Sequence, residues 1–418
     1  MSLLTIILQV ALGILAEHPS RAGGNLCGYF PQDTTVSVAP KGYSPFYISH
    51  IARHGSRFMS SRYADCFQVA DSLAYYDGKG MLTEDGLALM EDIRTLHRMA
   101  DGRYGDLTSL GAQEHRDICA RMVRHYPEVF TDPARQEVVT WSTASQRVQD
   151  SRTAFTGELL KRMPALHIDE QSARQKAKSY GLQEVTGYPM TKEERAEART
   201  TEKNFSSTLS ELRKGYHFDV FAGRIFLDPS AVPARSVRNI AIKAFRALKT
   251  ACVNEGPGLP DLDKYFTVEE LYYLWIGGSM PWCRYLNFPG YTYPITAASG
   301  GGILECIVKD ADQALASGSP VAATLRFSHD TYLLPLMATI PFEGTVLSDN
   351  YLEIPEHFQD FNFVCPACNV QLIFYRSADG PVLVKFLLNE KESLIHGLAP
   401  LTGRYYKWDK VKKFWRNR

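Results

Sequence analysis

The sequence predicts an α/β fold, a mostly parallel sheet flanked by helices and interrupted by a large helical insertion. Three observations predict it. Short apolar, partly β-branched runs lie near both ends of the chain, charges at helical spacing fill its middle, and strand-like and helix-like segments alternate again after residue 314. We therefore expect one α/β domain formed by residues 21–155 and 315–418. A mainly helical insertion domain at 156–314 would separate its two parts.

The predicted strands fall into two groups. Three runs have the length and composition of buried strands, namely residues 46–52, 137–141 and 321–327. Near the C-terminus, residues 370–375 and 382–388 flank the turn-forming residues 378–381, which predicts a hairpin. Polar residues follow each of the first three runs. They are expected at the carboxyl ends of strands, where open α/β sheets bind ligands.

The charge balance excludes one class of function. Lys and Arg total 46, Asp and Glu total 46, and the formal net charge is zero. A nucleic-acid-binding protein needs a basic surplus to neutralise phosphates. We therefore expect a small ligand, and we infer no nucleic-acid partner and no stable protein partner.

The N-terminal segment, residues 1–20, begins with the apolar run 1–16. This run is shorter than the ~20 residues that a membrane-spanning helix needs. Ala11-Leu12-Gly13 has the small-x-small pattern of a signal-peptide cleavage site, so we expect export to the periplasm, outer surface or secretory pathway. The first basic side chain is Arg21, so the positive start of a signal is missing. An apolar first helix of the mature fold is the alternative.

Eight cysteines are widely scattered, which would suit disulfides in an exported protein but fixes no pairing. Cys365-Pro366-Ala367-Cys368 has the spacing of half a zinc site or of a redox pair, yet no second such motif completes it. We expect both cysteines to pack as small apolar side chains before the strand 370–375. No carboxylate cluster with metal spacing occurs, so we expect no metal and no other cofactor.

The strongest chemical signal is Arg53-His54-Gly55-Ser56-Arg57, directly after the predicted strand 46–52. Two guanidinium groups beside one histidine are costly to bury without an anion, and their planar forks match phosphate oxygens. The cations would lower the pKa of His54 and keep it neutral and nucleophilic. Gly55 permits a tight turn and a close approach of the backbone. A surface Arg-His-Arg cluster is the alternative.

Two further segments repeat the construction of strand, polar loop and helix. After strand 137–141, Arg147 would lie near a helix N-terminus, where anions are favoured. After strand 321–327, His329 and Asp330 can supply a phosphate donor and a proton donor. Glu390, in the run 384–390, is the second candidate for the acid.

At these residues the sequence resembles the histidine acid phosphatase branch of the histidine phosphatase superfamily, and within it the multiple inositol polyphosphate phosphatases, which include bacterial phytases. The resemblance rests on residues 53–57, on 142–151 (STASQRVQDS) and on His329-Asp330. It implies metal-independent phosphomonoester hydrolysis through a phosphohistidine on His54. Arg53, Arg57, Arg147 and His329 would hold the phosphate, and Asp330 would be the acid.

One departure concerns the substrate. The inositol polyphosphate phosphatases usually have His-Ala-Glu where this chain has His329-Asp330-Thr331, the form found in other acid phosphatases and phytases. The departure bears on substrate breadth and positional preference and not on activity as a phosphatase. Three alternatives to an inositol polyphosphate phosphatase also stay open. They are a general acid phosphatase for small esters, a phosphotransferase similar to phosphoglycerate mutase, and a non-enzymatic phospholigand-binding module.

Additional phosphates of a polyphosphorylated substrate would need basic side chains at the rim of the pocket. Arg62, just beyond the first motif, is one candidate. Arg199 and Lys203 are others, because the basic residues of 191–203 would share one face of a helix. Glutamates interleave with them, so a solvated surface helix is the simpler interpretation of that segment. The segment 236–250 is the second predicted helix of the insertion.

Overall fold

The structure is a computed structural model that describes residues 3–30, 35–172, 184–214, 216–254, 258–286, 288, 290, 292–345 and 354–417. Its centre is one mixed sheet of eight strands. The strand order is β3 (His167–Ser172), β2 (Glu137–Ser142), β4 (Val321–Ser328), β1 (Ser44–Arg53), β5 (Asn369–Arg376), β6 (Leu383–Leu388) and β7 (Lys391–Ser393). The short β8 (Tyr406–Lys407) also pairs with β6. The predicted α/β fold is confirmed.

The parallel and antiparallel parts of the sheet meet at β1. The pairs β3–β2, β2–β4 and β4–β1 are parallel, whereas the pairs from β1 to β5 and onward are antiparallel. In the register, Phe327 of β4 lies opposite both Ala52 of β1 and Ser142 of β2. The three strands that precede the polar motifs therefore end at the same edge. The predicted hairpin is confirmed as the antiparallel pair β5–β6.

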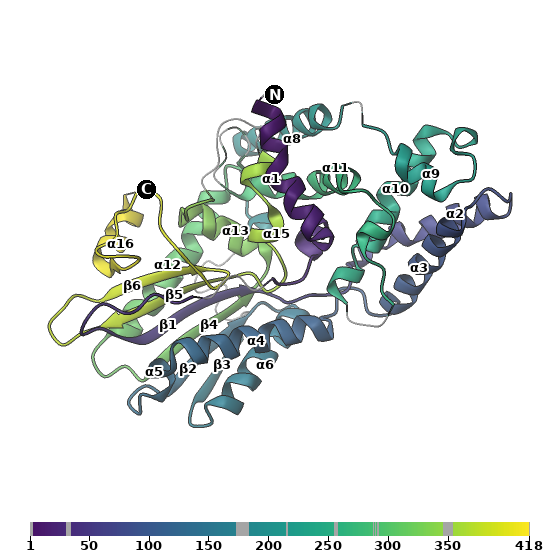
Figure 1. Cartoon of the computed structure of the whole chain (residues 1–418). Coiled ribbons are helices and arrows are strands. Elements are labelled where there is room, and N and C mark those ends of the chain that lie inside the picture. The colour runs from purple at the N-terminus through teal and green to yellow at the C-terminus, as the bar shows by residue number, and fades with distance from the viewer. Residues whose placement is uncertain are drawn as a thin grey trace.

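Helices cover both faces of this sheet (Figure 1). The larger helices in chain order are α1 (Leu3–Glu17), α2 (Val69–Asp77), α3 (Glu84–Ala100), α4 (Ser109–His125), α6 (Gln146–Arg162), α8 (Lys192–Leu212), α9 (Asp219–Ile225), α10 (Ala234–Leu248), α11 (Val268–Ser279), α12 (Thr296–Leu315), α13 (Asp330–Thr339) and α16 (Trp408–Arg416). Short helices are α5 (Pro127–Thr131), α14 (Ile354–His357) and α15 (Asp360–Phe363), besides several 3₁₀ turns such as η1 (Pro19–Leu26) and η2 (Ser61–Gln68). The predicted helices 191–203 and 236–250 correspond to α8 and α10.

The side chains of β1 alternate between two hydrophobic cores, as strand geometry requires. Ile48 and Ala52 belong to the core beneath α4 and α6, with Phe155 of α6. Tyr47 and Ile51 belong to the larger core on the other face, which includes residues of α12 and α13. Figure 1 shows α4 and α6 side by side on the first face and α12 on the second. The strand ends are therefore held between two packed layers.

A separate helical region lies beyond the sheet, where α3 packs against α2, α9 and α10 (Figure 1). The division of the chain into an α/β domain and an insertion at 156–314 stays a prediction. One strand was not expected: β3 adds residues of the proposed insertion to the edge of the sheet beside β2.

The apolar N-terminal segment forms α1, which packs against α11 and η1. Ala11 and Leu15 are buried, and the Ala11 N–H donates to Glu356 Oε2 at 3.1 Å. Among the described helices, none is long and apolar enough to cross a membrane. All eight cysteines lie in described parts of the chain and none forms a disulfide there, and Cys365 and Cys368 are buried as expected.

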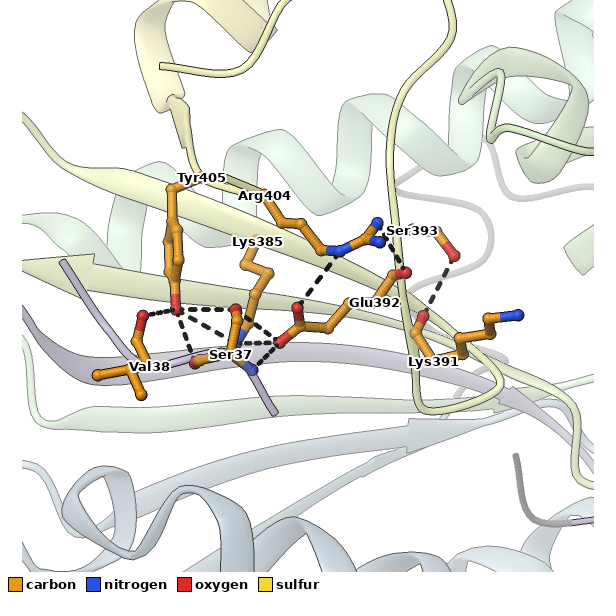
Figure 2. Close-up of polar contacts among 8 residues, drawn as sticks. All are labelled: Ser37, Val38, Lys385, Lys391, Glu392, Ser393, Arg404 and Tyr405. Atoms are coloured by element: carbon orange, nitrogen blue, oxygen red, sulfur yellow. Dashed lines mark hydrogen bonds and ion pairs between the residues drawn. The ribbon is translucent and has the colours of Figure 1, made fainter. Parts of the chain in front are cut away.

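A polar network closes the other edge of the sheet (Figure 2). Lys385 of β6 is fully buried and lies 2.7 Å from Glu392 Oε1 of β7. The Ser37 backbone N–H donates to the same oxygen at 2.7 Å, and the Tyr405 hydroxyl lies 3.1 Å from the Ser37 carbonyl oxygen. Arg404 donates to the backbone oxygen of Glu392 at 3.2 Å. The chain before β1 is thereby tied to the edge formed by β6 and β7.

Candidate active site

Arg53, the last residue of β1, is the anchor of the site. Its side chain is fully buried, and its Nη1 donates to the carbonyl oxygens of Asn25, at 3.0 Å, and Val364. Its backbone N–H donates to the Cys368 carbonyl at 2.9 Å. Nη2 lies 3.2 Å from Asp330 Oδ2. Of its three guanidinium nitrogens, Nη1 is thus fixed by hydrogen bonds to the protein, Nη2 faces the carboxylate that follows β4, and Nε has no hydrogen-bond partner among the described residues.

His54 is fixed by backbone contacts on both sides. Its N–H donates to the Ser328 carbonyl at 2.9 Å, and its carbonyl accepts from the Ala367 N–H at 2.9 Å. Its ring Nδ1 lies 2.8 Å from the Gly55 carbonyl oxygen. A carbonyl only accepts, so Nδ1 must carry the proton, which leaves the lone pair on Nε2. This is the tautomer that a histidine nucleophile needs at Nε2.

Gly55 permits the candidate catalytic loop, residues 54–57, to touch the start of α4. A Cβ at Gly55 would lie 2.2 Å from the Gly111 carbonyl oxygen, and one at Gly111 would lie 2.1 Å from the Ser56 carbonyl oxygen. The Gly55 N–H donates to Ser151 Oγ of α6 at 3.1 Å. Thr108, the N-cap of α4, donates its backbone N–H to the Ser56 carbonyl at 2.9 Å. The loop is therefore held between the N-terminus of α4 and Ser151 of α6.

Glu114 is a buried carboxylate behind this loop that sequence reasoning missed. It accepts the Ser56 N–H and the Ser56 hydroxyl, both at 2.7 Å, and the Tyr29 N–H at 2.8 Å. Burial raises its pKa to about 7, although these hydrogen bonds act in the opposite direction. Its only sequence signal is its place one turn after Gly111, on the same face of α4.

Arg147 and His329 lie close together, although they follow two different strands, β2 and β4. Arg147, in the first turn of α6, has its Nη2 3.4 Å from His329 Nδ1. His329 Nε2 lies 3.2 Å from Thr143 Oγ1. The rings of His54 and His329 are nearly perpendicular, with centroids 5.4 Å apart. The structure thus brings the three separate motifs of the sequence into one site.

The site concentrates positive charge. Burial, then Arg53, Arg57, Arg147 and His329, lowers the pKa of His54 well below its usual value. Burial and Arg147 lower the pKa of His329 to about 4. Burial and the neighbouring arginines lower the pKa of Arg57 to about 9 and also depress that of Arg147. A bound anion would relieve this repulsion, so the arrangement is suited to bind an anion.

The three proposed rim residues differ in position. Arg62 lies close enough to Arg57 to contribute to the lowering of its pKa. Arg199 and Lys203 are exposed on α8, whose buried side carries Ala198 and Phe205. Arg62 is therefore near Arg57, and a role at the rim for Arg62, Arg199 and Lys203 stays a prediction.

Two glutamates complete the description. Glu184 was missed; it accepts the Thr331 hydroxyl at 2.5 Å and places a carboxylate near Arg147. Glu390, the second candidate acid, is held by Arg121 at 2.9 and 2.7 Å and by the Tyr29 hydroxyl at 2.9 Å. These contacts make Glu390 a buried anchor between α4 and the β6–β7 turn.

The comparison with known families decides the assignment. The profile of the histidine phosphatase superfamily (branch 2) matches residues 48–389. The chain belongs to this family. No curated protein sequence matches the chain.

Solved structures share the fold of this histidine phosphatase at low sequence identity. The Bifidobacterium longum multiple inositol polyphosphate phosphatase in complex with phosphate superposes with a TM-score of 0.73 and 18% identity, covering 94% of this chain and 97% of that one. The phytase from D. castellii gives 0.68 and 16%, covering 95% and 85%. A Hafnia alvei phytase in complex with tartrate gives 0.52 and 14%, covering 91% and 98%. The Bifidobacterium enzyme has also been crystallised with inositol hexasulfate.

Proposed function

We propose that this histidine phosphatase hydrolyses phosphomonoesters of inositol polyphosphates, including phytate, without a metal and through a phosphohistidine. The observation that carries the proposal is the state of His54. Its Nδ1–H is held by the Gly55 carbonyl, and burial together with the surrounding cations lowers the pKa of the ring and keeps Nε2 unprotonated. A nucleophile is thus presented where arginines can hold a phosphate.

In the first step His54 Nε2 attacks phosphorus, and the bond from phosphorus to the ester oxygen breaks. Arg53, Arg57, Arg147 and His329 hold the phosphoryl oxygens, because the transition state spreads negative charge over them. The leaving oxygen takes a proton from Asp330. In the second step water gives a proton to Asp330 and its oxygen attacks phosphorus. The bond from His54 to phosphorus breaks, which releases phosphate and restores the enzyme.

The test is phosphate release from inositol hexakisphosphate in EDTA at acidic pH. We expect turnover by the wild type and none by His54→Ala. Acid-labile, base-stable phosphate trapped on the wild type should map to His54. Substantial turnover by His54→Ala would end the covalent mechanism, and transfer of labelled phosphate to an added alcohol in place of water would favour a phosphotransferase.

A general acid phosphatase acting on small esters is the second candidate, and Glu184 favours it. This carboxylate, fixed to the Thr331 hydroxyl near Arg147, would repel the outer phosphates of a polyphosphorylated substrate.

The proposed basic residues at the rim of the pocket distinguish the inositol polyphosphate phosphatase from the general acid phosphatase. If α8 contacts the substrate, Arg199→Ala with Lys203→Ala should raise KM for inositol hexakisphosphate, and added salt should enlarge that rise. Hydrolysis of p-nitrophenyl phosphate should not change. Equal effects on both substrates, or none on either, would remove α8 from substrate recognition and favour the general acid phosphatase. We also propose that the protein is exported, which N-terminal sequencing of the secreted form would test.

A further inference from the structure

A second cavity lies in the helical region, apart from the phosphate site. It measures about 780 Å³ and is bounded by the end of α8, the start of α9 and the first turns of α10. A smaller cavity of about 500 Å³ on the α8 side shares Arg213 and Arg238 with it. None of the phosphate-site residues lines either cavity. Figure 1 shows α9 and α10 at the end of the molecule opposite α16.

The lining of the larger cavity is basic. Arg213, Arg235 and Arg238 all border it, with His217, against Asp219 as the acidic side chain. Among the described residues, no carboxylate forms an ion pair with any of the three arginines. The whole chain carries equal numbers of basic and acidic side chains. Three arginines without a paired carboxylate around one cavity therefore give it a local excess of positive charge.

Arg213 is fixed in place and retains an unused donor. Its Nη2 donates to the Tyr273 carbonyl at 3.2 Å, and its guanidinium lies 4.8 Å from the centre of the Tyr273 ring. The same group occupies the space over Gly277, where any Cβ would collide with it. Its Nε is buried without a hydrogen-bond partner. Burial, together with nearby Arg238, lowers its pKa, an effect that an anion in the cavity would reverse.

The first turn of α10 adds donors at the same wall. Pro233, Ala234 and Arg235 line the cavity, and Pro233 stands at the N-cap, where it offers no side chain to accept the first N–H groups of this 15-residue helix. The N-terminus of a helix carries partial positive charge and favours anions. The start of a helix and three arginines therefore line one hollow.

We propose that this cavity is a second anion site, which binds a small molecule carrying several phosphate groups. Arginine forks match phosphate oxygens, and cations on separate elements around a hollow of this size suit several phosphates better than one. Both inositol phosphates and linear polyphosphates have this chemistry. The proposal does not depend on the proposed function, because the cavity shares no residue with the phosphate site.

Calorimetric titration of the full chain carrying His54→Ala tests the proposal, since this change prevents turnover during the experiment. One arm uses inositol hexakisphosphate and the other inorganic tripolyphosphate. We expect a binding event additional to the one that Arg57→Ala removes. Adding Arg235→Ala and Arg238→Ala should weaken that second event at least tenfold. The matched control, Arg94→Ala with Arg98→Ala, removes the same charge from α3 and should leave it unchanged.

The two probes distinguish inositol phosphates from linear polyphosphates as the ligand. The preferred class is that of the probe whose binding is weakened more by Arg235→Ala with Arg238→Ala. In the wild-type background, Arg235→Ala with Arg238→Ala should keep kcat/KM for p-nitrophenyl phosphate within twofold. The proposal is overturned if neither probe shows an event sensitive to the double variant. It is also overturned if the double variant and the α3 control weaken binding equally. A third contrary result is that the double variant abolishes the same binding event that Arg57→Ala removes.

Discussion

At the scale of single residues, the proposed nucleophile His54 is oriented by the residue that follows it. The Gly55 carbonyl sets the tautomer of His54, whereas in many hydrolases a carboxylate orients the histidine. A backbone acceptor carries no full charge, so it does not raise the pKa of the ring as a carboxylate would. His54 therefore stays unprotonated in acid, which a phosphatase working at low pH requires.

Asp330 should matter in proportion to the basicity of the leaving group. Asp330→Asn should slow hydrolysis of inositol or alkyl phosphates by about 10²–10⁴-fold, the usual contribution of a general acid, because an alkoxide needs a proton. Hydrolysis of p-nitrophenyl phosphate should fall far less, since its phenolate leaves without one. Comparison of kcat for the two substrates checks this. Equal losses would assign Asp330 to holding Arg53 in place.

Glu114 should act as a positioning residue. Each of its carboxylate oxygens accepts a backbone N–H, one from Ser56 and the other from Tyr29, so Glu114→Gln keeps one of the two acceptors and should lower kcat less than Glu114→Ala does. Glu114→Ala removes the acceptor of the Ser56 N–H and should lower kcat by roughly 10²-fold, because small displacements of a nucleophile are costly. Steady-state kinetics of the wild type and both variants at pH 5 measure these changes in kcat. Equal damage by Gln and Ala would refute positioning through hydrogen bonds.

The residues of the site were predictable to different degrees. Those proposed to hold the phosphate lie in short motifs after strands, and the structure brings Arg53, His54, Arg147 and His329 together. The partners behind them were not predictable, because they come from distant parts of the chain. Glu114 lies 58 residues from Ser56, and Val364 lies 311 residues from Arg53. A buried polar partner at such a separation leaves no local pattern.

At the scale of elements, the catalytic loop depends on its contact with α4. Gly111→Ala should push the loop of residues 54–57 away from α4, because the new Cβ would lie 2.1 Å from the Ser56 carbonyl oxygen. We expect a destabilisation of about 1–3 kcal/mol, typical of overpacking, together with a large loss of kcat. Urea unfolding and kinetics measure the two effects.

Gly157→Ala in α6 is the matched control. No atom lies within 4 Å of the new Cβ, so it should stabilise the protein by about 0.5–1 kcal/mol, as alanine does in a helix. Unchanged activity and stability in Gly111→Ala would show that the contact is dispensable.

The elements differ in how visible they are in the sequence. The central strands are apolar and buried on both faces, so their runs predict β1, β2 and β4 to within a few residues. β3 was missed because its residues, HIDEQS, are mainly polar. It pairs on one side with β2, so its place at the edge of the sheet does not demand an apolar sequence.

At the scale of the whole molecule, stability should fall in acid through the buried histidines. Burial lowers the pKa of His50 to about 3, so the folded state keeps it neutral, whereas the unfolded chain protonates it below about pH 6.5. The unfolded state then binds more protons, and this contribution to stability, complete above pH 6.5, is lost as the pH falls toward 3. Glu114 acts in the opposite sense, because its pKa is raised in the folded state.

His50→Leu isolates this effect. Between pH 7 and pH 5 the wild type should lose about 2 kcal/mol more of its free energy of unfolding than the variant, given the difference between the two pKa values of His50. Urea titrations of both proteins at the two pH values measure the difference. Parallel losses would show that His50 is protonated equally in both states.

The pairing of β1 with β4 also sets an order of events during synthesis. Ile48 lies beside Ala323 in the sheet, so 323 − 48 = 275 residues must be translated before the two strands can meet. At 5–20 residues per second this takes roughly 15–55 seconds. During that time β1 lacks its hydrogen-bonded neighbours, and the catalytic loop has no His329 or Asp330 beside it. A nascent chain is therefore expected to be inactive until nearly all of it has left the ribosome. Until then, chaperones should find β1, which leads directly to the proposed nucleophile, the most exposed strand.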